Sequence, residues 1–220
     1  MKTTASALTT LCVMALSFSA PAPSLAAPFT VRDFFAGLDA EFIAVEDELS
    51  PEEKDEILRS GPERNDSVCP ADGAASGAWY VLERNETPTS MELRTCSGSS
   101  AVLRIYGRTS GGFIGAVISI MGNHGQTQTF RFFEVSLAGQ VGKEVRKESL
   151  GFQAVHRNEL LTKAQRFPAD ENSTVPLFDV GNGAFEAQPW TFADPSWSGR
   201  HIRRVRFVWD GSQFRKRVIR

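Results

Sequence analysis

The chain contains few of the residues that most often carry catalysis or bind metals. It has only three His, three Cys and two Tyr. His124, His156 and His201 share no H-E-x-x-H spacing, and no cluster of carboxylates lies beside any of them in the sequence. We therefore predict no metal site, no cofactor and no histidine-based catalytic centre.

Motifs that bind nucleotides or build a serine nucleophile are missing as well. The sequence has no G-x-S-x-G elbow, no P-loop, no G-x-G-x-x-G fingerprint and no calcium-binding loop. The Gly-Asn-Gly stretch at 181–183 is too short to cradle a phosphate and predicts a turn. A hydrolase of unrecognised type stays open, because two carboxylates can come together in space without a sequence signature. No residue is assigned a catalytic role.

No hydrophobic run is long enough to span a bilayer. Residues 7–20 form an apolar stretch that follows the basic Lys2 and is too short for a transmembrane helix. The triplet SLA at 24–26 has the small-x-small pattern of a signal-peptidase site. We therefore predict a signal peptide over 1–26, a periplasmic or secreted location, and no transmembrane segment after cleavage. The mature chain, 27–220, has the length of a single domain.

The few cysteines predict a disulfide. Cys12 lies within the predicted signal peptide, which leaves Cys69 and Cys96 in the mature chain. An even number of cysteines in an exported protein favours one disulfide between them. In the chain-entropy model such a closed loop stabilises the fold by roughly 3–4 kcal/mol. Free thiols or a shared metal are the alternatives.

Charge is nearly balanced in total but uneven along the chain. The formal net charge is −2, yet residues 39–56 hold nine acids and one Lys, and residues 200–220 hold eight Arg or Lys and one Asp. Such asymmetry indicates partner binding, internal pairing of the two segments, or two solvated faces. We expect the acidic segment to lie near the basic one, or both to be solvated.

Two helix starts predict an acidic helical segment at about 30–60. Thr30 with an acid three residues later has the pattern of a helix cap, and Ser50-Pro51 followed by Glu53 is a stronger one. Apolar residues at helical spacing form one stripe: Phe34, Leu38, Phe42, Val45 and Leu49. This stripe must cover another element, most simply a sheet.

From residue 79 the hydrophobic period changes from helical to two. The segments that alternate as strands are 79–82, 91–94, 102–106, 113–121 and 129–135. No helix-length segment separates them, so we predict an α+β fold that is mainly antiparallel sheet, a meander or a half-barrel. Further on, 158–167 predict a short helix capped by Asn158, and 175–187 predict two short strands.

The stretch FVWDGSQF at 207–214 predicts a hairpin with Asp210-Gly211 in its turn. Its loop has two or four residues, and both lengths give the same faces. The apolar face is predicted to carry Val205, Phe207, Trp209, Phe214 and Val218. The opposite face carries Arg204, Arg206, Arg215 and Arg217, which we call the arginine surface. Like charges across a ladder cost stability, so this surface is the candidate binding site.

Two resemblances to bacterial proteins follow from short stretches. SGAWY at 76–80 resembles the S-G-x-x-Y loop of periplasmic lysozyme inhibitors, which are small disulfide-containing β-barrels whose loop enters the lysozyme cleft. A β-rich exported chain ending in the W-D-G-x-x-F hairpin of Trp209, Asp210, Gly211 and Phe214 also resembles bacterial secreted proteins of unknown function. The second resemblance implies an envelope location and no particular activity.

These patterns together predict an exported, non-catalytic binding or accessory protein of a bacterial envelope. The partner expected for the arginine surface is an anionic protein or an envelope polymer. Nucleic acid is not expected, because the chain is exported and the aromatic residues of the hairpin face away from its arginines. The alternatives are a lysozyme inhibitor that uses the loop at 76–80, and an unrecognised hydrolase.

Overall fold

The computed structural model of the chain describes residues 28–43, 49–60, 79–82, 85–121, 127–189, 195–198, 200 and 202–219. Within them the fold is α+β and mostly antiparallel sheet, which confirms the predicted fold class. The predicted signal peptide and Cys69 lie outside these residues, so cleavage and the disulfide to Cys96 stay predictions. No helix in the described part of the chain is long and apolar enough to cross a membrane.

The first sheet is a six-stranded meander whose strands lie in sequence order, and it contains all five strands predicted between 79 and 135. Its strands are β1 (Trp79–Val81), β2 (Ser90–Thr95), β3 (Ser100–Gly107), β4 (Phe113–Met121), β5 (Thr127–Val135) and β6 (Val141–Val145). Strand β6 was not predicted, because its sequence VGKEV is mostly exposed and polar.

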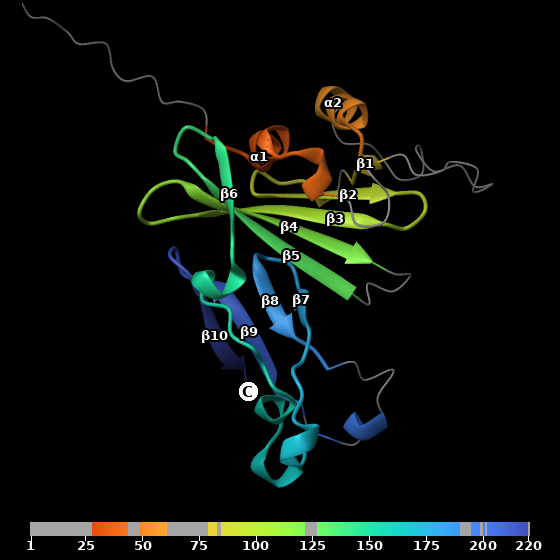
Figure 1. Cartoon of the computed structure of the whole chain (residues 1–220), viewed down its shortest axis with the longest axis vertical. Coiled ribbons are helices and arrows are strands. Elements are labelled where there is room, and N and C mark those ends of the chain that lie inside the picture. Colours follow the sequence, from red (N-terminus) through yellow and green to blue (C-terminus); the bar gives the residue numbers. More distant parts are fainter. Residues whose placement is uncertain are drawn as a thin grey trace, which may run out of the picture.

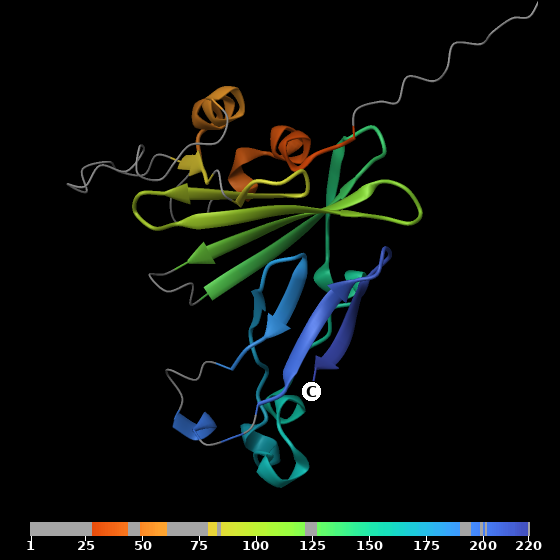
Figure 2. The ribbon, with the colours of Figure 1, turned by 180° about the vertical axis from the view of Figure 1, so that it is seen from behind.

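The second sheet has four antiparallel strands in the order β10-β9-β8-β7. Its strands are β7 (Leu177–Asp179), β8 (Ala184–Ala187), β9 (Arg204–Trp209) and β10 (Phe214–Ile219). The two strands predicted in 175–187 are therefore confirmed. The second sheet lies on one side of the meander, and the N-terminal helices lie on the other (Figures 1 and 2).

Two α-helices and several 3-10 turns complete the described elements. The α-helices are α1 (Val31–Gly37) and α2 (Pro51–Ser60). The 3-10 turns are η1 (Ala40–Phe42), η3 (Lys147–Leu150), η4 (Arg157–Leu160), η5 (Lys163–Gln165), η6 (Ala169–Glu171) and η7 (Pro195–Trp197). Both predicted helix starts are confirmed, since the side chains of Thr30 and Ser50 each accept a hydrogen bond from a backbone N–H three residues on.

Three residues of the predicted apolar stripe are buried as expected, Phe42 is half-buried, and Val45 lies outside the described residues; the stripe does not lie on one helix. Helix α1 ends at Gly37, and Leu38 is extended with φ −89° and ψ 138°. Phe34, Leu38 and Leu49 are nevertheless buried against the meander. The chain therefore covers the sheet with short pieces of helix joined by bends.

A close approach holds α1 on the meander. Gly115 in β4 faces the helix, and a Cβ placed on it would lie 2.2 Å from Cε2 of Phe34. Only a glycine leaves room for this ring, which is fully buried. The contact fixes the depth at which the helical layer packs on the sheet.

The expected proximity of the acidic segment 39–56 to the basic hairpin is wrong. The described helices of this segment pack on the outer face of the meander, whereas the hairpin belongs to the sheet on its inner side (Figures 1 and 2). The ion pairs of the hairpin use other acids, namely Glu159, Glu186 and Asp210. Position along the chain did not reveal that the meander separates the two segments.

The helix predicted for 158–167 is replaced by the 3-10 turns η4 and η5. Asn158 does not cap a helix; its side-chain Nδ2 donates to the carbonyl of Phe167 at 2.9 Å, and its Oδ1 accepts from the Phe167 N–H at 2.6 Å. This pair of hydrogen bonds closes residues 158–167 into a loop, which satisfies the backbone without a regular helix.

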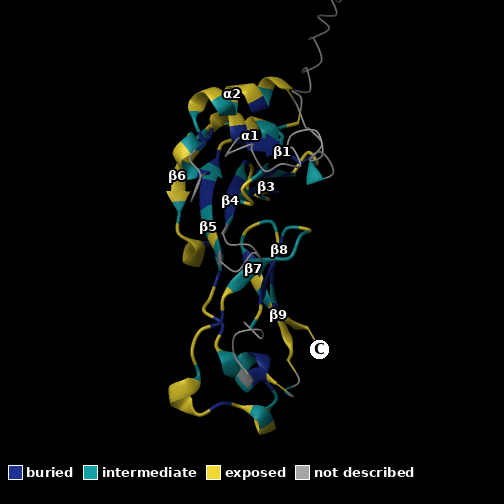
Figure 3. Ribbon diagram, turned by 90° about the vertical axis from the view of Figure 1, so that its right-hand side faces the viewer, coloured by how far each residue is buried: buried dark blue, intermediate teal, exposed yellow. Residues whose placement is uncertain are grey.

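Two apolar clusters pack on opposite faces of the meander. One lies beneath α1 and α2, and the other lies between the two sheets, where it contains many aromatic rings. Phe152, Phe185 and Phe214 pack against one another there, with ring centroids 4.5–5.4 Å apart. Figure 3 shows the buried residues concentrated along the meander and within the second sheet, with exposed residues at both ends.

Gly115→Ala is expected to lower the free energy of unfolding by about 1–3 kcal/mol, because the added methyl group collides with the Phe34 ring. Gly107→Ala is the matched control, since a Cβ at Gly107 meets no atom within 4 Å. Urea unfolding of both variants measures the difference. Equal stability of the two would show that α1 does not pack on Gly115.

Candidate functional site

The inner face of the meander has an apolar half and a polar half. On β4, the inward side chains of Ile114, Ala116 and Ile118 are buried under the second sheet. On β2, the inward residues Ser90 and Glu92 are only partly buried. The four-stranded sheet therefore covers one half of this face, and the other half forms the floor of a cleft.

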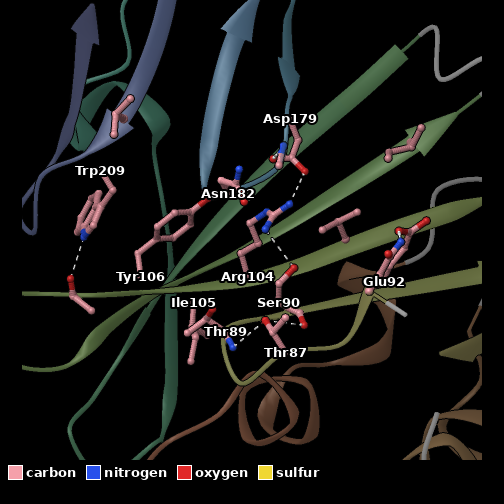
Figure 4. A pocket seen from close by; sticks show the side chains of 17 residues that line it. Thr87, Thr89, Ser90, Glu92, Arg104, Ile105, Tyr106, Asp179, Asn182 and Trp209 are labelled. Carbon is pink, nitrogen blue, oxygen red and sulfur yellow. Dashed lines mark hydrogen bonds and ion pairs between the residues drawn. The ribbon is translucent and has the colours of Figure 1, made fainter. Parts of the chain in front are cut away.

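The cleft has a volume of about 1010 Å³ and lies open to the surface between the two sheets. Strands β2 and β3 form its floor, the turn between β7 and β8 forms one wall, and Trp209 of β9 stands at one end (Figure 4). Its size is at the upper end of the range for sites that bind small molecules.

An ion pair spans the cleft and joins the sheets. Nη2 of Arg104 on β3 lies 2.8 Å from Oδ2 of Asp179 on β7, and Nη1 donates to Oγ of Ser90 at 3.1 Å. The side chains of Arg104 and Asp179 are only 14 % and 7 % exposed. The backbone N–H of Asp179 is held by Gln128 Oε1 at 2.8 Å, so β5 helps to position the acid.

Two hydrogen-bond donors in the cleft have no partner among the described residues. They are Nε of Arg104 and the hydroxyl of Tyr106, both buried from solvent. Burial raises the pKa of the Tyr106 hydroxyl, so it stays protonated and remains a donor at every physiological pH. A buried donor without a partner costs about 1–3 kcal/mol, so a bound acceptor would recover this energy.

The turn between β7 and β8 approaches the Tyr106 ring closely. Gly181, Asn182 and Gly183 have φ values of 80°, 51° and 69°, which is the left-handed region. A Cβ at Gly183 would lie 3.2 Å from the Tyr106 ring, so glycine lets the turn approach closely. The predicted turn at 181–183 is confirmed, and it forms a wall of the cleft.

The other charged group of the cleft is also paired. Glu92 accepts hydrogen bonds from Arg94 Nε and from the side-chain amide of Asn85. The rim beside it is polar but uncharged, with Thr87 and Thr89 in the turn before β2. The charged side chains of the cleft thus neutralise one another in pairs.

The C-terminal hairpin is fastened to the meander at this site. The Trp209 indole N–H donates to the Gly107 carbonyl at 2.8 Å, and the Thr109 N–H donates to the Gly211 carbonyl at 2.8 Å. Trp209 pairs with Phe214 across a four-residue loop, which settles the register that the sequence left open. The hairpin therefore presents a half-buried, fixed indole ring to the cleft.

The arginine surface exists as a face, but internal acids partly neutralise it. Arg204, Arg206, Arg215 and Arg217 share the side of the second sheet opposite the core, and Arg206 lies across from Arg217. Buried Glu186 binds Arg206 through two hydrogen bonds of 2.7 and 2.9 Å and lies 3.7 Å from Arg204.

Arg215 also has an internal partner, the loop acid Asp210 at 2.6 Å. Hydrogen bonds from the Gln213 N–H, and then from Arg215, lower the pKa of Asp210 below its usual value. On the predicted apolar face, Val205, Phe207 and Phe214 are buried, whereas Val218 is exposed near the end of the edge strand.

The residues behind the other interpretations lie elsewhere. Trp79 and Tyr80 are buried in β1, which contradicts a protruding inhibitor loop at these two residues; 76–78 lie outside the described residues. His156 is exposed, with Nδ1 3.2 Å from the Asn172 carbonyl oxygen. His124 and His201 are not among the described residues, in which no His, Cys, Asp and Glu gather in a group that could hold a metal.

A second hollow, of about 560 Å³, lies beside β5 and η3. It contains none of the unpaired buried side-chain atoms found in the described residues, so it has no polar group that awaits a ligand.

Comparisons with protein-family models, with curated proteins and with solved structures gave no match. The function is therefore inferred from the geometry of this chain.

Sequence reasoning missed Arg104, Tyr106 and Asp179. One signal was present, because strict alternation in 102–106 places Arg104 on the same face as Val102 and Tyr106, where a charge is unexpected. Its partner could not be found, since Asp179 is 75 residues away on a strand whose place in the second sheet no local pattern indicates.

A double-mutant cycle on Arg104 and Asp179 is expected to give a larger coupling energy than an exposed pair. Breaking the buried pair by Asp179→Ala should cost about 3–5 kcal/mol, because Arg104 is left without a counterion. The exposed pair Arg131–Glu144 is the control, with an expected coupling of about 0.2–1 kcal/mol. Similar coupling in both cycles would show that the pair does not join the two sheets.

Proposed function

We propose that this chain is an exported, non-catalytic binding protein of a bacterial envelope and that the cleft around Arg104 is its ligand site. The observation that carries the proposal is the pair of buried, unpartnered donors on Arg104 and Tyr106, two residues that line a hollow large enough for a small molecule. A buried donor without a partner costs free energy of folding, which a bound acceptor would recover.

Binding is favoured over catalysis by the pairing of charges in the cleft. Asp179 accepts from Arg104 and from the Gly181 N–H, and Glu92 accepts from Arg94 and Asn85. Carboxylates held in this way are poor proton acceptors, because their lone pairs are already used. Hydrogen bonding to a ligand would therefore fall mainly to the uncharged polar residues that line the cleft.

The arginine surface is the second candidate, as a contact for an anionic envelope polymer. Side chains of Arg204 and Arg215 are 66 % and 57 % exposed, and Arg217 is exposed with no ion pair to another described residue. Arg206 belongs to the structural pair with Glu186, so the contact would rest on the other three. Export, predicted from residues 1–26, would place this surface beside such polymers.

Tyr106→Phe tests the ligand site, because it removes only the hydroxyl. Without ligand, the variant should be as stable as the parent or more stable by about 1 kcal/mol, since the buried hydroxyl has no described partner to lose. The small-molecule fraction of the envelope should raise the melting temperature of the parent, and Tyr106→Phe should lose most of that increase. Equal increases in both proteins would refute the cleft as the site.

Arg217→Gln and Arg206→Gln separate contact from structure on the arginine surface. Arg217→Gln should weaken retention on an immobilised anionic polymer such as polygalacturonate without changing stability. Arg206→Gln should instead lower stability by about 1–3 kcal/mol, because Glu186 is left buried with one distant cation. Unchanged retention of Arg217→Gln across a salt series would remove this surface as a candidate.

A further inference from the structure

We infer that the cleft takes an uncharged, hydroxyl-rich ligand, a neutral oligosaccharide; this rests on the proposed function of the cleft as a binding site. Charge is the first feature of the cleft that selects the ligand. The cation Arg104 is already neutralised by Asp179 at 2.8 Å, and Glu92 is already paired with Arg94. An anionic ligand would approach two carboxylates and meet no free cation among the residues that line the cleft.

The unpartnered atoms of the cleft also restrict the ligand. Nε of Arg104 and the Tyr106 hydroxyl are both donors, so each requires an acceptor atom on the ligand. A cationic ligand offers donors in this position, which cannot satisfy Nε of Arg104 because a guanidinium only donates. Hydroxyl, ring and carbonyl oxygens of a neutral sugar accept hydrogen bonds without bringing a charge into a buried site.

The rim of the cleft carries uncharged polar side chains. The uncharged polar residues that line the cleft are Asn85, Thr87, Thr89, Ser90 and Asn182. Hydroxyl and amide side chains both donate and accept hydrogen bonds. A sugar hydroxyl also does both, so each one can be satisfied here without a change of protonation. These uncharged side chains offer no charge to offset that of a phosphate, a sulfate or an ammonium group.

One end of the cleft is aromatic. Trp209 is half-buried, and its indole N–H is held by the Gly107 carbonyl, so the ring orientation is fixed. Its ring lies 5.7 Å from that of Tyr106. A rigid aromatic face packs against the C–H side of a sugar ring at little cost in side-chain entropy. In Figure 4, Trp209 and Glu92 lie at opposite ends with Arg104 between them, which suits an extended chain of sugar units.

Calorimetric titration of the exported protein with tetrasaccharides tests the inference. The neutral probes are cellotetraose, maltotetraose and chitotetraose, the anionic probe is tetragalacturonate, and the cationic probe is deacetylated chitotetraose. At least one neutral probe should bind with a Kd that changes less than about twofold between about 50 and 500 mM NaCl. The charged probes should bind about tenfold more weakly or not at all.

Variants connect that binding to the cleft. Tyr106→Phe should lower the affinity for the neutral probe by about fivefold, which is the typical effect of one lost hydrogen bond. Asn182→Gly keeps the left-handed turn and should also weaken binding, whereas Arg217→Gln on the arginine surface is the control and should not. Unchanged affinity in both cleft variants overturns the inference.

Two outcomes of the titration overturn the ligand class. They are tighter, salt-sensitive binding of tetragalacturonate, and failure of all three neutral probes. The proposed function fails separately, if the envelope fraction gives no stabilisation that depends on the Tyr106 hydroxyl. An envelope ligand that does depend on this hydroxyl, together with failure of the neutral probes, would refute the saccharide and keep the site.

Discussion

The fold depends on the unequal numbers of strands in its two sheets. The meander presents six strands to the second sheet, and the second sheet has only four with which to cover them. Aromatic and aliphatic side chains of β4 and β5 fill the covered half. The uncovered half lines the open cleft, and it carries Ser90, Glu92 and Arg104 instead. The cleft is thus the place where the core ends, and the Arg104–Asp179 pair joins the two sheets there.

The C-terminal hairpin has a structural role that its basic composition conceals. It closes the second sheet, its tip is bonded to the meander through Gly107 and Thr109, and Trp209 forms one end of the cleft. Its charged face is a consequence of the same alternation, since residues opposite the core must be polar. Buried Glu186 compensates Arg206 at the centre of that face. The aromatic side of the hairpin therefore contributes to the proposed ligand site, and its basic side adds a separate surface.

Elements with strong local signals could be predicted from the sequence, and contacts distant in sequence could not. The caps at Thr30 and Ser50, the alternation of 79–135 and the turn at Asp210-Gly211 each depend on neighbours a few residues away. The helix expected at 158–167 does not form, because the Asn158 side chain hydrogen-bonds to Phe167 instead of capping a helix. The site was missed for the same reason, since Arg104 and Asp179 meet only when the two sheets pack.

Proton exchange at the Arg104 Nε–H tests the central claim, that an unpartnered donor in the cleft awaits an acceptor. Nitrogen-edited NMR of the arginine side chains resolves this proton, and an Arg104→Lys spectrum assigns it. On titration with the neutral tetrasaccharide that binds most tightly, the account predicts slower exchange with water and a downfield shift at Arg104, with no change at the exposed Arg217. Saturated binding that leaves the Arg104 signal unchanged would contradict the account.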